Sequence, residues 1–446
     1  MDNMNTGPMN TGPLREDRPD TLERLLSLCA KRSPQKTALC DPPNRSNLER
    51  NPEQLMPRQY TYEELDRTVS RLAAHFASLG LSPWDYVAVQ TAHFSETPLL
   101  VLALMRAGLV PCLLPLSWSI GEISLSFQCL KPAALISCGQ MEEVNHSQMM
   151  RELAFSSLHV RFVMGVGHNV AEGVSDISAL FDPARTDRAD FSSQHTPNLA
   201  DLALVTYIDP STPVPHTNGQ ILATGLQHVL ELELSENDHI LSPYPLSSIP
   251  GLAACFYPWL MAGCCLSLHH PFQFNALQEQ LQKTSFSLFP APEQVMRWLL
   301  QSHLPVPQKL AVVRRDSALP IQELHRLPSL DLYDLWNLGG LGSVIGKYTG
   351  EPDSSGLFPA GRLCLPPDDQ AKLCLAAGRI IDDRLHVKGR IFPRPDKLPS
   401  SQEWLALKQR RHDDWLDTGL AATAGADDSI VLNGNGLLPH MQKAAS

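Results

Sequence analysis

Glycine and positive charge are both scarce in this sequence. Its 446 residues include 26 glycines against 37 prolines, and 36 Lys and Arg against 47 Asp and Glu, which gives a net charge of −11. A protein that binds nucleic acid through the phosphates needs a basic face, so this balance argues against a nucleic-acid partner. The proline excess also argues against a glycine-rich phosphate loop, because proline has no backbone N–H and cannot adopt a positive φ.

Targeting and thiol motifs are missing as well. The polar segment 1–19 repeats Met-Asn-Thr-Gly-Pro, which predicts a disordered tail and no signal peptide. No two of the ten cysteines form a C-x-x-C pair, so we expect no metal site, and we interpret them as buried, reduced thiols of a cytoplasmic protein. The charge-free run 251–268 contains Pro258 and Gly263 and predicts a buried helix that leads into a buried strand, not a membrane span.

Helix and strand patterns alternate along the first 300 residues. The clearest helix is 61–80, where Thr61 and Glu64 form a capping box and Gly80 is placed to end the helix. Short strands separated by apolar helices follow it. The predicted strands are Tyr86–Val89, Val110–Leu114, Ala133–Ser137, Ala203–Tyr207 and Cys265–His269. This order is typical of parallel, doubly wound sheets.

The predicted fold class is therefore α/β, with two doubly wound subdomains of mixed or parallel sheet and a small β-rich subdomain. The tail 1–19 precedes them, and a second tail, 436–446, follows them. The three subdomains are predicted at 20–200, 201–359 and 360–435.

Several segments, in the same order, resemble one known family. They are TYEELDRTVSRLAAHFASLGLSPWDYVAVQ at 61–90, LLVLALMRAGLVPCLLPL at 99–116, a stretch that begins PLSSIPGLAACFYPWLMAG at 245, LHVKGR at 385–390 and DDWLDTGL at 413–420. This set is similar to the large N-terminal domain of the adenylate-forming superfamily, which comprises acyl-CoA synthetases, peptide-synthetase adenylation domains and luciferases. The resemblance covers about residues 20–435 and implies the fold of that domain.

The catalytic motifs of that family are altered in this sequence. Its phosphate loop, Thr-Ser-Gly-Thr-Thr-Gly-x-Pro-Lys-Gly, corresponds to IDPSTPVPHTNG at 208–219, where Pro210 and Pro213 replace glycines and His216 replaces the lysine. The matching positions are Ser211, Thr212 and Pro215. Since proline removes N–H donors, the resemblance implies a degenerate nucleotide loop at Ser211, Thr212, Pro215 and His216.

Further family positions are altered too. In the adenine and Mg²⁺ segment, Leu338–Gly342, only Gly339 matches, and Gly342 stands where the family has its metal-binding glutamate. Leu420 replaces the ribose-binding aspartate, and the chain stops at Ser446, without room for the small C-terminal domain that carries the family's catalytic lysine. An acyl or adenine pocket, if retained, is expected beside Ser248, Gly251, Gly339 and Gly340.

These substitutions favour a pseudoenzyme with no catalytic residues and no cofactor. By the resemblance, it would bind or scaffold a carrier protein, or an active ligase or synthase, in a natural-product or acyl-lipid pathway, with an acyl ligand as a further partner. Two alternatives stay open. One is a divergent ligase that activates a carboxylic acid with ATP and Mg²⁺, and the other is an acyl or small-molecule sensor.

Overall fold

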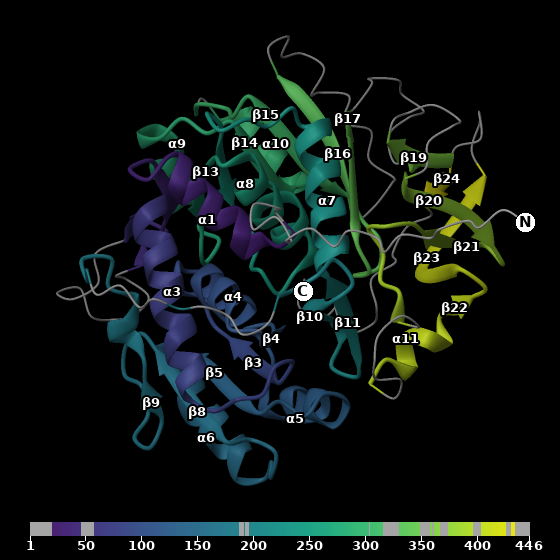
Figure 1. Cartoon of the computed structure of the whole chain (residues 1–446). Helices are drawn as coiled ribbons and strands as arrows, with labels where there is room; N and C mark the ends of the chain where they lie inside the picture. The colour runs from purple at the N-terminus through teal and green to yellow at the C-terminus, as the bar shows by residue number, and fades with distance from the viewer. Residues whose placement is uncertain are drawn as a thin grey trace, which may run out of the picture.

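Three large sheets organise the chain (Figure 1). The computed structural model describes residues 20–45, 58–186, 191, 196–302, 304–314, 330–347, 357–358, 361–365, 373–395, 403–424 and 430–432. The predicted tails 1–19 and 436–446 lie outside these residues. The α/β class with an additional antiparallel sheet is confirmed.

The first large sheet has the order β11-β10-β4-β3-β5-β8-β9. Its strands are β3 (Tyr86–Gln90), β4 (Val110–Leu113), β5 (Ala134–Cys138), β8 (Phe162–Val166), β9 (Ser175–Asp176), β10 (Leu202–Asp209) and β11 (Thr212–Thr217). All neighbours are parallel except β10 and β11, which form an antiparallel hairpin. A separate two-stranded ribbon pairs β6 (Gln140–Met141) with β7 (Val144–Asn145).

The second large sheet has the order β17-β16-β15-β14-β12-β13-β1-β2. Its strands are β1 (Thr37–Cys40), β2 (Gln59–Thr61), β12 (His239–Ser242), β13 (Cys265–Leu268), β14 (Leu288–Pro292), β15 (Lys309–Arg314), β16 (Asp331–Asn337) and β17 (Ser343–Lys347). The inner strands are parallel, and β2 and β17 pair antiparallel at the two edges.

Sheet composition cuts across the subdomain ranges predicted from the sequence. Strands β1 and β2 come from the range 20–200 but lie in the second sheet, whereas β10 and β11 come from the range 201–359 but lie in the first. A boundary between residues 200 and 201 therefore does not separate the two sheets. The sequence of a short polar link does not indicate which of the two sheets the next strand joins.

The helices carry the apolar faces that close the core. They are α1 (Leu22–Arg32), α3 (Tyr62–Ser78), α4 (Glu96–Arg106), α5 (Ile120–Cys129), α6 (His146–Phe155), α7 (Asn218–Glu231), α8 (Tyr257–Ala262), α9 (Phe274–Lys283), α10 (Glu293–Gln301) and α11 (Leu405–Gln409), with a 3₁₀ turn at Ser178–Phe181 and a π-helical turn at Gly251–Phe256. Helix α3 packs on β1 and β2 of the second sheet, α4 packs on β4 and β10 of the first, and the two helices pack on each other. One apolar cluster joins residues of both sheets and of these helices.

Local predictions for the longest helix are confirmed. The Thr61 hydroxyl accepts from the backbone N–H of Glu64, and the Glu64 carboxylate accepts from the backbone N–H of Thr61, which is a capping box at the start of α3. Gly80 follows the helix with φ +68°. The apolar run 251–268 forms the π-helical turn, α8 and β13, as predicted, and no helix among the described residues is long and apolar enough to cross a membrane.

The third sheet has the order β18-β24-β23-β21-β20-β19, with β22 paired to β23 (Figure 1, green to yellow). Its strands are β18 (Leu357–Phe358), β19 (Gly361–Leu365), β20 (Leu373–Ile381), β21 (Arg384–Lys388), β22 (Arg411–His412), β23 (Trp415–Ala424) and β24 (Ile430–Leu432). Its pairs are antiparallel, and its apolar side chains share a cluster with Ile208 of β10 and Val214 of β11.

A buried ion cluster ties β1 to α4. Arg45 is 0% exposed and donates to the carboxylates of Asp41 (2.6 Å) and Glu96 (3.0 Å), and Arg58 donates to Glu96 (2.8 Å). Asp41 also accepts from the backbone N–H of Ser95 just before α4 (2.8 Å). Since β1 lies in the second sheet and α4 packs on β4 of the first, this cluster joins the two sheets by charge.

Candidate nucleotide and acyl site

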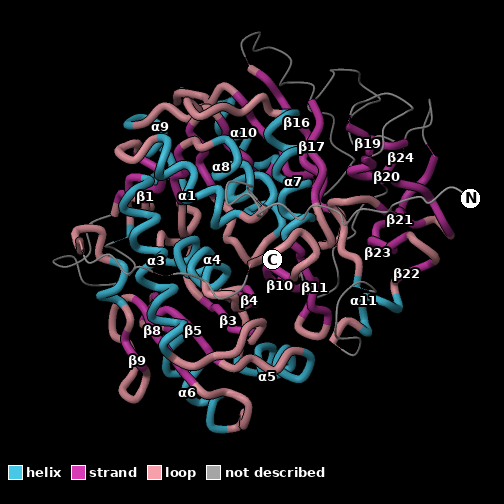
Figure 2. The backbone as a smooth tube through the Cα atoms, in the orientation of Figure 1, coloured by secondary structure: helices cyan, strands magenta, loops and turns pink. Residues whose placement is uncertain are grey.

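The segment 208–219, predicted as a phosphate loop, is mostly a tight β-hairpin (Figure 2). Asp209 of β10 pairs with Thr212 of β11, so only Pro210 and Ser211 lie between the two strands. The predicted residues Ser211 and Thr212 stand at this turn, and Pro215 and His216 lie within β11 opposite Val205 and Leu204. The structure therefore brings the four residues into one hairpin, with Ser211 in the turn and the other three in β11.

His216 is built into the interior. Its side chain is 6% exposed, and Nε2 lies 2.8 Å from the Thr206 hydroxyl on the paired strand. Burial lowers the pKa of His216 to about 4, so the imidazole is neutral at pH 7. A neutral, buried ring cannot provide the positive charge that the family places here.

The hairpin turn is closed by its own acid. The Asp209 carboxylate accepts from the backbone N–H of Ser211 (2.9 Å) and from its hydroxyl (2.6 Å). Burial alone would raise the pKa of Asp209, but the hydrogen bonds from Ser211 and Thr212 outweigh it and hold this pKa below its ordinary value. The turn thus presents the Asp209 carboxylate, and the backbone N–H of Ser211 is already bonded to it and is not available to a phosphate.

These residues do not fit a nucleotide triphosphate. Two positions where the family has glycine lack a backbone N–H, because Pro210 occupies the turn and Pro213 lies in β11. The Asp209 charge would repel phosphate oxygens. In the part of the chain that the structure describes, no group of three or more His, Cys, Asp or Glu side chains is placed to hold a metal ion.

Gly339 and Gly340 form the turn between β16 and β17, with φ of +62° and +77°. A Cβ on Gly339 would lie 2.0 Å from the carbonyl oxygen of Thr418 in β23, and a Cβ on Gly340 would lie 3.1 Å from the Ile208 side chain in β10. This turn therefore meets the phosphate-loop strand and the ribose-motif strand. The three family motifs come together in space, and backbone and apolar atoms fill their contact.

Ser248 precedes the π-helical turn and Gly251 begins it, and both residues contact the preceding loop. The Ser248 hydroxyl donates to the carbonyl of Pro245 (2.7 Å), and a Cβ on Gly251 would lie 2.3 Å from the same oxygen. Gly251 is thus needed for close backbone packing. That role differs from lining an open acyl pocket, and the pairing of these two residues with Gly339 and Gly340 stays a prediction.

The polar side chains of the ribose motif in β23 hydrogen-bond to groups of β21 and β23. Asp417, the acid nearest to the altered position Leu420, accepts from the backbone N–H of Gly419 (2.7 Å) and from Arg384 of β21 (3.1 Å). The Thr418 hydroxyl donates to the carbonyl of Leu385 (2.8 Å). These bonds fix the strand and leave Asp417 turned to β21.

Two neighbours of this junction escaped prediction. Gln220 in the first turn of α7 donates from its amide to the carbonyl of Phe392, and the Phe392 ring lies 3.1 Å from a Cβ placed on Gly342. A signal for Gln220 was present, because Thr217 and Gln220 form a capping box that starts α7.

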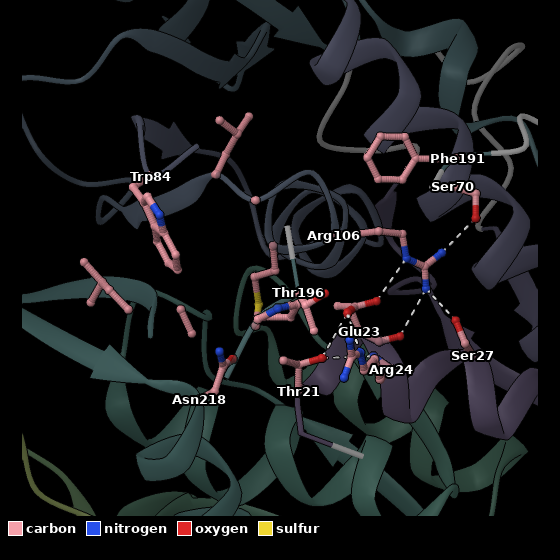
Figure 3. Close-up of a pocket in the computed structure, with 16 residues that line it drawn as sticks. Thr21, Glu23, Arg24, Ser27, Ser70, Trp84, Arg106, Phe191, Thr196 and Asn218 are labelled. Atoms are coloured by element: carbon pink, nitrogen blue, oxygen red, sulfur yellow. Dashed lines mark hydrogen bonds and ion pairs between the residues drawn. The ribbon is translucent and has the colours of Figure 1, made fainter. Parts of the chain in front are cut away.

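A cavity of about 320 Å³ lies elsewhere, against the beginning of β10 and of α7 (Figure 3). Arg106 at the end of α4 forms one wall, and its guanidinium donates to Asp66 (2.7 Å), Ser70 (2.8 Å) and Ser27 (2.9 Å). The Asn218 amide on the opposite side donates to the carbonyl of Asn198 (3.0 Å). The hairpin turn is at the other end of β10, and Asn218 is the one residue of the segment 208–219 that lines this cavity.

The comparison with protein families decides the relationship. The model of the AMP-binding enzyme family matches residues 26–346, more than two thirds of the chain. The chain belongs to the AMP-binding enzyme family.

Curated relatives of this AMP-binding protein are ligases and synthases. Pseudomonine synthase PmsE of Pseudomonas entomophila is 25% identical over 333 residues, which is 71% of this chain and 52% of that protein. A 2-hydroxy-7-methoxy-5-methyl-1-naphthoate–CoA ligase of Streptomyces carzinostaticus is 27% identical over 30% of this chain and 24% of its own length. The chain thus matches about half the length of the first relative and less of the second.

Solved structures of AMP-binding enzymes share the fold. Apo MbtA of Mycobacterium smegmatis superposes with a TM-score of 0.73 at 19% identity, over 94% of this chain and 77% of that one. The N-terminal subdomain of Klebsiella oxytoca NpsA, in complex with 3-hydroxybenzoyl-AMSN, superposes with a TM-score of 0.65 at 16% identity, over 93% of this chain and all of that one. This chain therefore has the architecture of the large domain.

Proposed function

We propose that this AMP-binding family protein is a pseudoenzyme that binds partners and does not adenylate a substrate itself. The observation that carries the proposal is the β10–β11 hairpin, in which a buried neutral His216 and a self-closed turn occupy the place of the phosphate loop. Losing one preorganised electrostatic donor commonly costs 10²–10³ in rate, and here several are absent from one motif. No cofactor is assigned to the protein on this proposal.

The partners that we propose follow from the relatives. One relative is pseudomonine synthase PmsE, and a third, triostin synthetase I of Streptomyces triostinicus, is 45% identical over 53 residues, which is 10% of that protein. We therefore place the protein beside a carrier protein, or an active ligase or synthase, of a natural-product pathway in the cytoplasm. The acyl class that suits it best is an aromatic acid, because one relative is a naphthoate ligase and NpsA holds a 3-hydroxybenzoyl group.

Titration calorimetry with ATP and Mg²⁺ tests the nucleotide half of this proposal. The expected result is no binding tighter than about 1 mM, since the turn offers a carboxylate in place of N–H donors. ATP–pyrophosphate exchange with a panel of aromatic and aliphatic acids is measured alongside, with an active ligase of the family as the positive control. Binding in the micromolar range, or exchange above the no-enzyme blank, would contradict the pseudoenzyme proposal.

A second candidate function is a divergent ligase that activates a carboxylic acid with ATP and Mg²⁺. Family membership and the kept contact between the three motifs favour it. Exchange activity that requires Asp417, and is lost in an Asp417→Asn variant with unchanged stability, would establish this alternative. Native mass spectrometry of freshly purified protein addresses the sensor alternative, which predicts a co-purifying acyl ligand.

A further inference from the structure

The cavity at the start of β10 has one apolar side and one polar side (Figure 3). The apolar side comes from the end of α4 and the starts of β4 and β10, and its residues are Met105, Leu109, Leu202 and Ala203. The polar side comes from the first turn of α1. The cavity volume of about 320 Å³ lies at the lower end of the range of small-molecule pockets, about 300–1,000 Å³, and suits a ligand of one or two rings.

Trp84 lines this cavity in a backbone conformation that bulky residues avoid. Its φ is +71°, in the left-handed region. The turn around it is anchored, because the Trp84 backbone N–H donates to the carbonyl of Gly108 (2.8 Å). The Asp85 carboxylate also accepts from the backbone N–H of Ser82 (2.9 Å). The indole is nevertheless 38% exposed, and a strained, anchored aromatic residue outside the core is typical of a ligand site.

Arg24 supplies unused hydrogen-bond donors on the polar side. In the part of the chain that the structure describes, its guanidinium donates no hydrogen bond, and the nearest carboxylate oxygens, of Asp20 and Glu23, are 3.6 and 3.9 Å away. Arg106, by contrast, already donates to Glu23 (3.3 Å) and Asp66 (2.7 Å). Because loose surface ion pairs contribute little, the planar fork of Arg24 can turn to the oxygens of a ligand.

The charge around the cavity favours an anion at this end. The charged side chains that line it are Arg24, Arg106 and Glu23, two cations and one acid. Helices α1 and α7 both begin at the cavity, where Thr21 and Asn218 line it, so the positive ends of two helix dipoles face it. Their capping side chains already accept from the first turns, so the dipoles contribute only a field and Arg24 provides the hydrogen bonds.

We propose that this cavity binds a planar aromatic carboxylate of one or two rings. The carboxylate pairs with the guanidinium of Arg24, which matches its two oxygens in a bidentate geometry. The ring packs on Trp84 and on the apolar side of the cavity. An uncharged ring would leave Arg24 without an acceptor, and an aliphatic acid would not stack on the indole. The site does not depend on the function proposed above.

Isothermal titration calorimetry with 1-naphthoate, in the absence of ATP, tests this site in the full chain. The wild type is expected to bind 1-naphthoate about tenfold more tightly than the uncharged 1-naphthamide, and Arg24→Gln is expected to weaken 1-naphthoate binding by about tenfold or more. Arg32→Gln is the matched control and should leave the affinity unchanged. Arg32 lies in the last turn of the same helix, and its side chain is 75% exposed. Without ATP, the outcome does not depend on whether the protein adenylates acids.

Trp84→Gly separates binding from stability. Glycine adopts a positive φ readily, so the thermal unfolding curve should stay close to that of the wild type while 1-naphthoate binds roughly threefold to tenfold more weakly. Equal affinity of the wild type, Arg24→Gln and Trp84→Gly would locate 1-naphthoate elsewhere and overturn the proposal. So would equal affinity for 1-naphthoate and 1-naphthamide, or the absence of 1-naphthoate binding to the wild type up to about 5 mM.

Discussion

Replacing Glu96 with glutamine should measure how strongly the buried ion cluster joins the two sheets. The Glu96 carboxylate is buried, which opposes ionisation, but Arg45 and Arg58 outweigh this and lower its pKa to about 2 from an ordinary 4.5. At 1.36 kcal/mol per pKa unit, the charged carboxylate stabilises the folded state by about 3 kcal/mol at pH 7. Breaking a buried ion pair by removing one partner costs 3–5 kcal/mol in other proteins, which is the same range.

The stabilisation by the Glu96 carboxylate should decrease as the pH falls. Because the pKa of Glu96 is lower in the folded state, its contribution is complete above pH 4.5 and is lost as the pH falls toward 2. Urea unfolding of wild type and Glu96→Gln, followed by tryptophan fluorescence, should therefore differ by about 3 kcal/mol at pH 7 and by roughly half of that at pH 3.

Glu279→Gln is the control for the same experiment. It removes an exposed i,i+4 pair with Lys283 and should cost no more than about 0.5 kcal/mol. The reasoning is refuted if Glu96→Gln costs as little as the control at pH 7. It is refuted equally if the difference between wild type and Glu96→Gln is the same at pH 7 and pH 3.

Three other predictions concern the candidate site and its frame. Gly339→Ala should lower the free energy of unfolding by about 3 kcal/mol or more, because at its positive φ the new Cβ would overlap the Thr418 carbonyl. Gly419→Ala, also at positive φ but with open space around it, should cost about 1 kcal/mol. Thermal unfolding compares the two variants, and similar costs would argue against close packing at Gly339. His216→Lys restores the lysine of the family but buries an ammonium, so it should lower the free energy of unfolding by about 4 kcal/mol. ATP binding should stay undetectable by calorimetry, and recovered ATP binding would show that the hairpin can open. Thr61→Ala should cost about 1 kcal/mol through loss of the α3 cap, and circular dichroism melts with Ser78→Ala as the control would detect it.

The sequence predicted the elements well where the determinants are local. The capping box of Thr61 and Glu64 and the positive φ of Gly80 bracket α3, because a cap depends only on residues three or four apart. The apolar run after Gly251 was also placed correctly, since a proline, a glycine and the absence of charge are visible without tertiary structure.

Long-range placement was less accessible from the sequence. Nothing local to Cys40 indicates that its strand pairs with β13, more than 200 residues later. At the site, Pro210 and Pro213 indicated lost N–H donors. Prolines are rare inside strands, so Pro213 and Pro215 concealed the strand β11 and with it the hairpin. The apolar cluster that joins the third sheet to Ile208 and Val214 of the hairpin links residues more than 150 positions apart, which local patterns do not reveal.

The exchange of strands between the two large sheets has a consequence for how the protein is made. Strand β1 can pair with β2 as soon as both have been synthesised, but its other edge has no partner until β13 follows, about 225 residues later, which at 5–20 residues per second is a delay of about 10–45 s. Every strand of the first sheet is complete once β11 ends at Thr217, whereas the second edge of β1 stays exposed on the ribosome-bound chain until β13 is made. A nascent chain or truncated fragment that ends between Thr217 and Cys265 is therefore expected to bind chaperones or to aggregate, even though it contains one entire sheet of the fold.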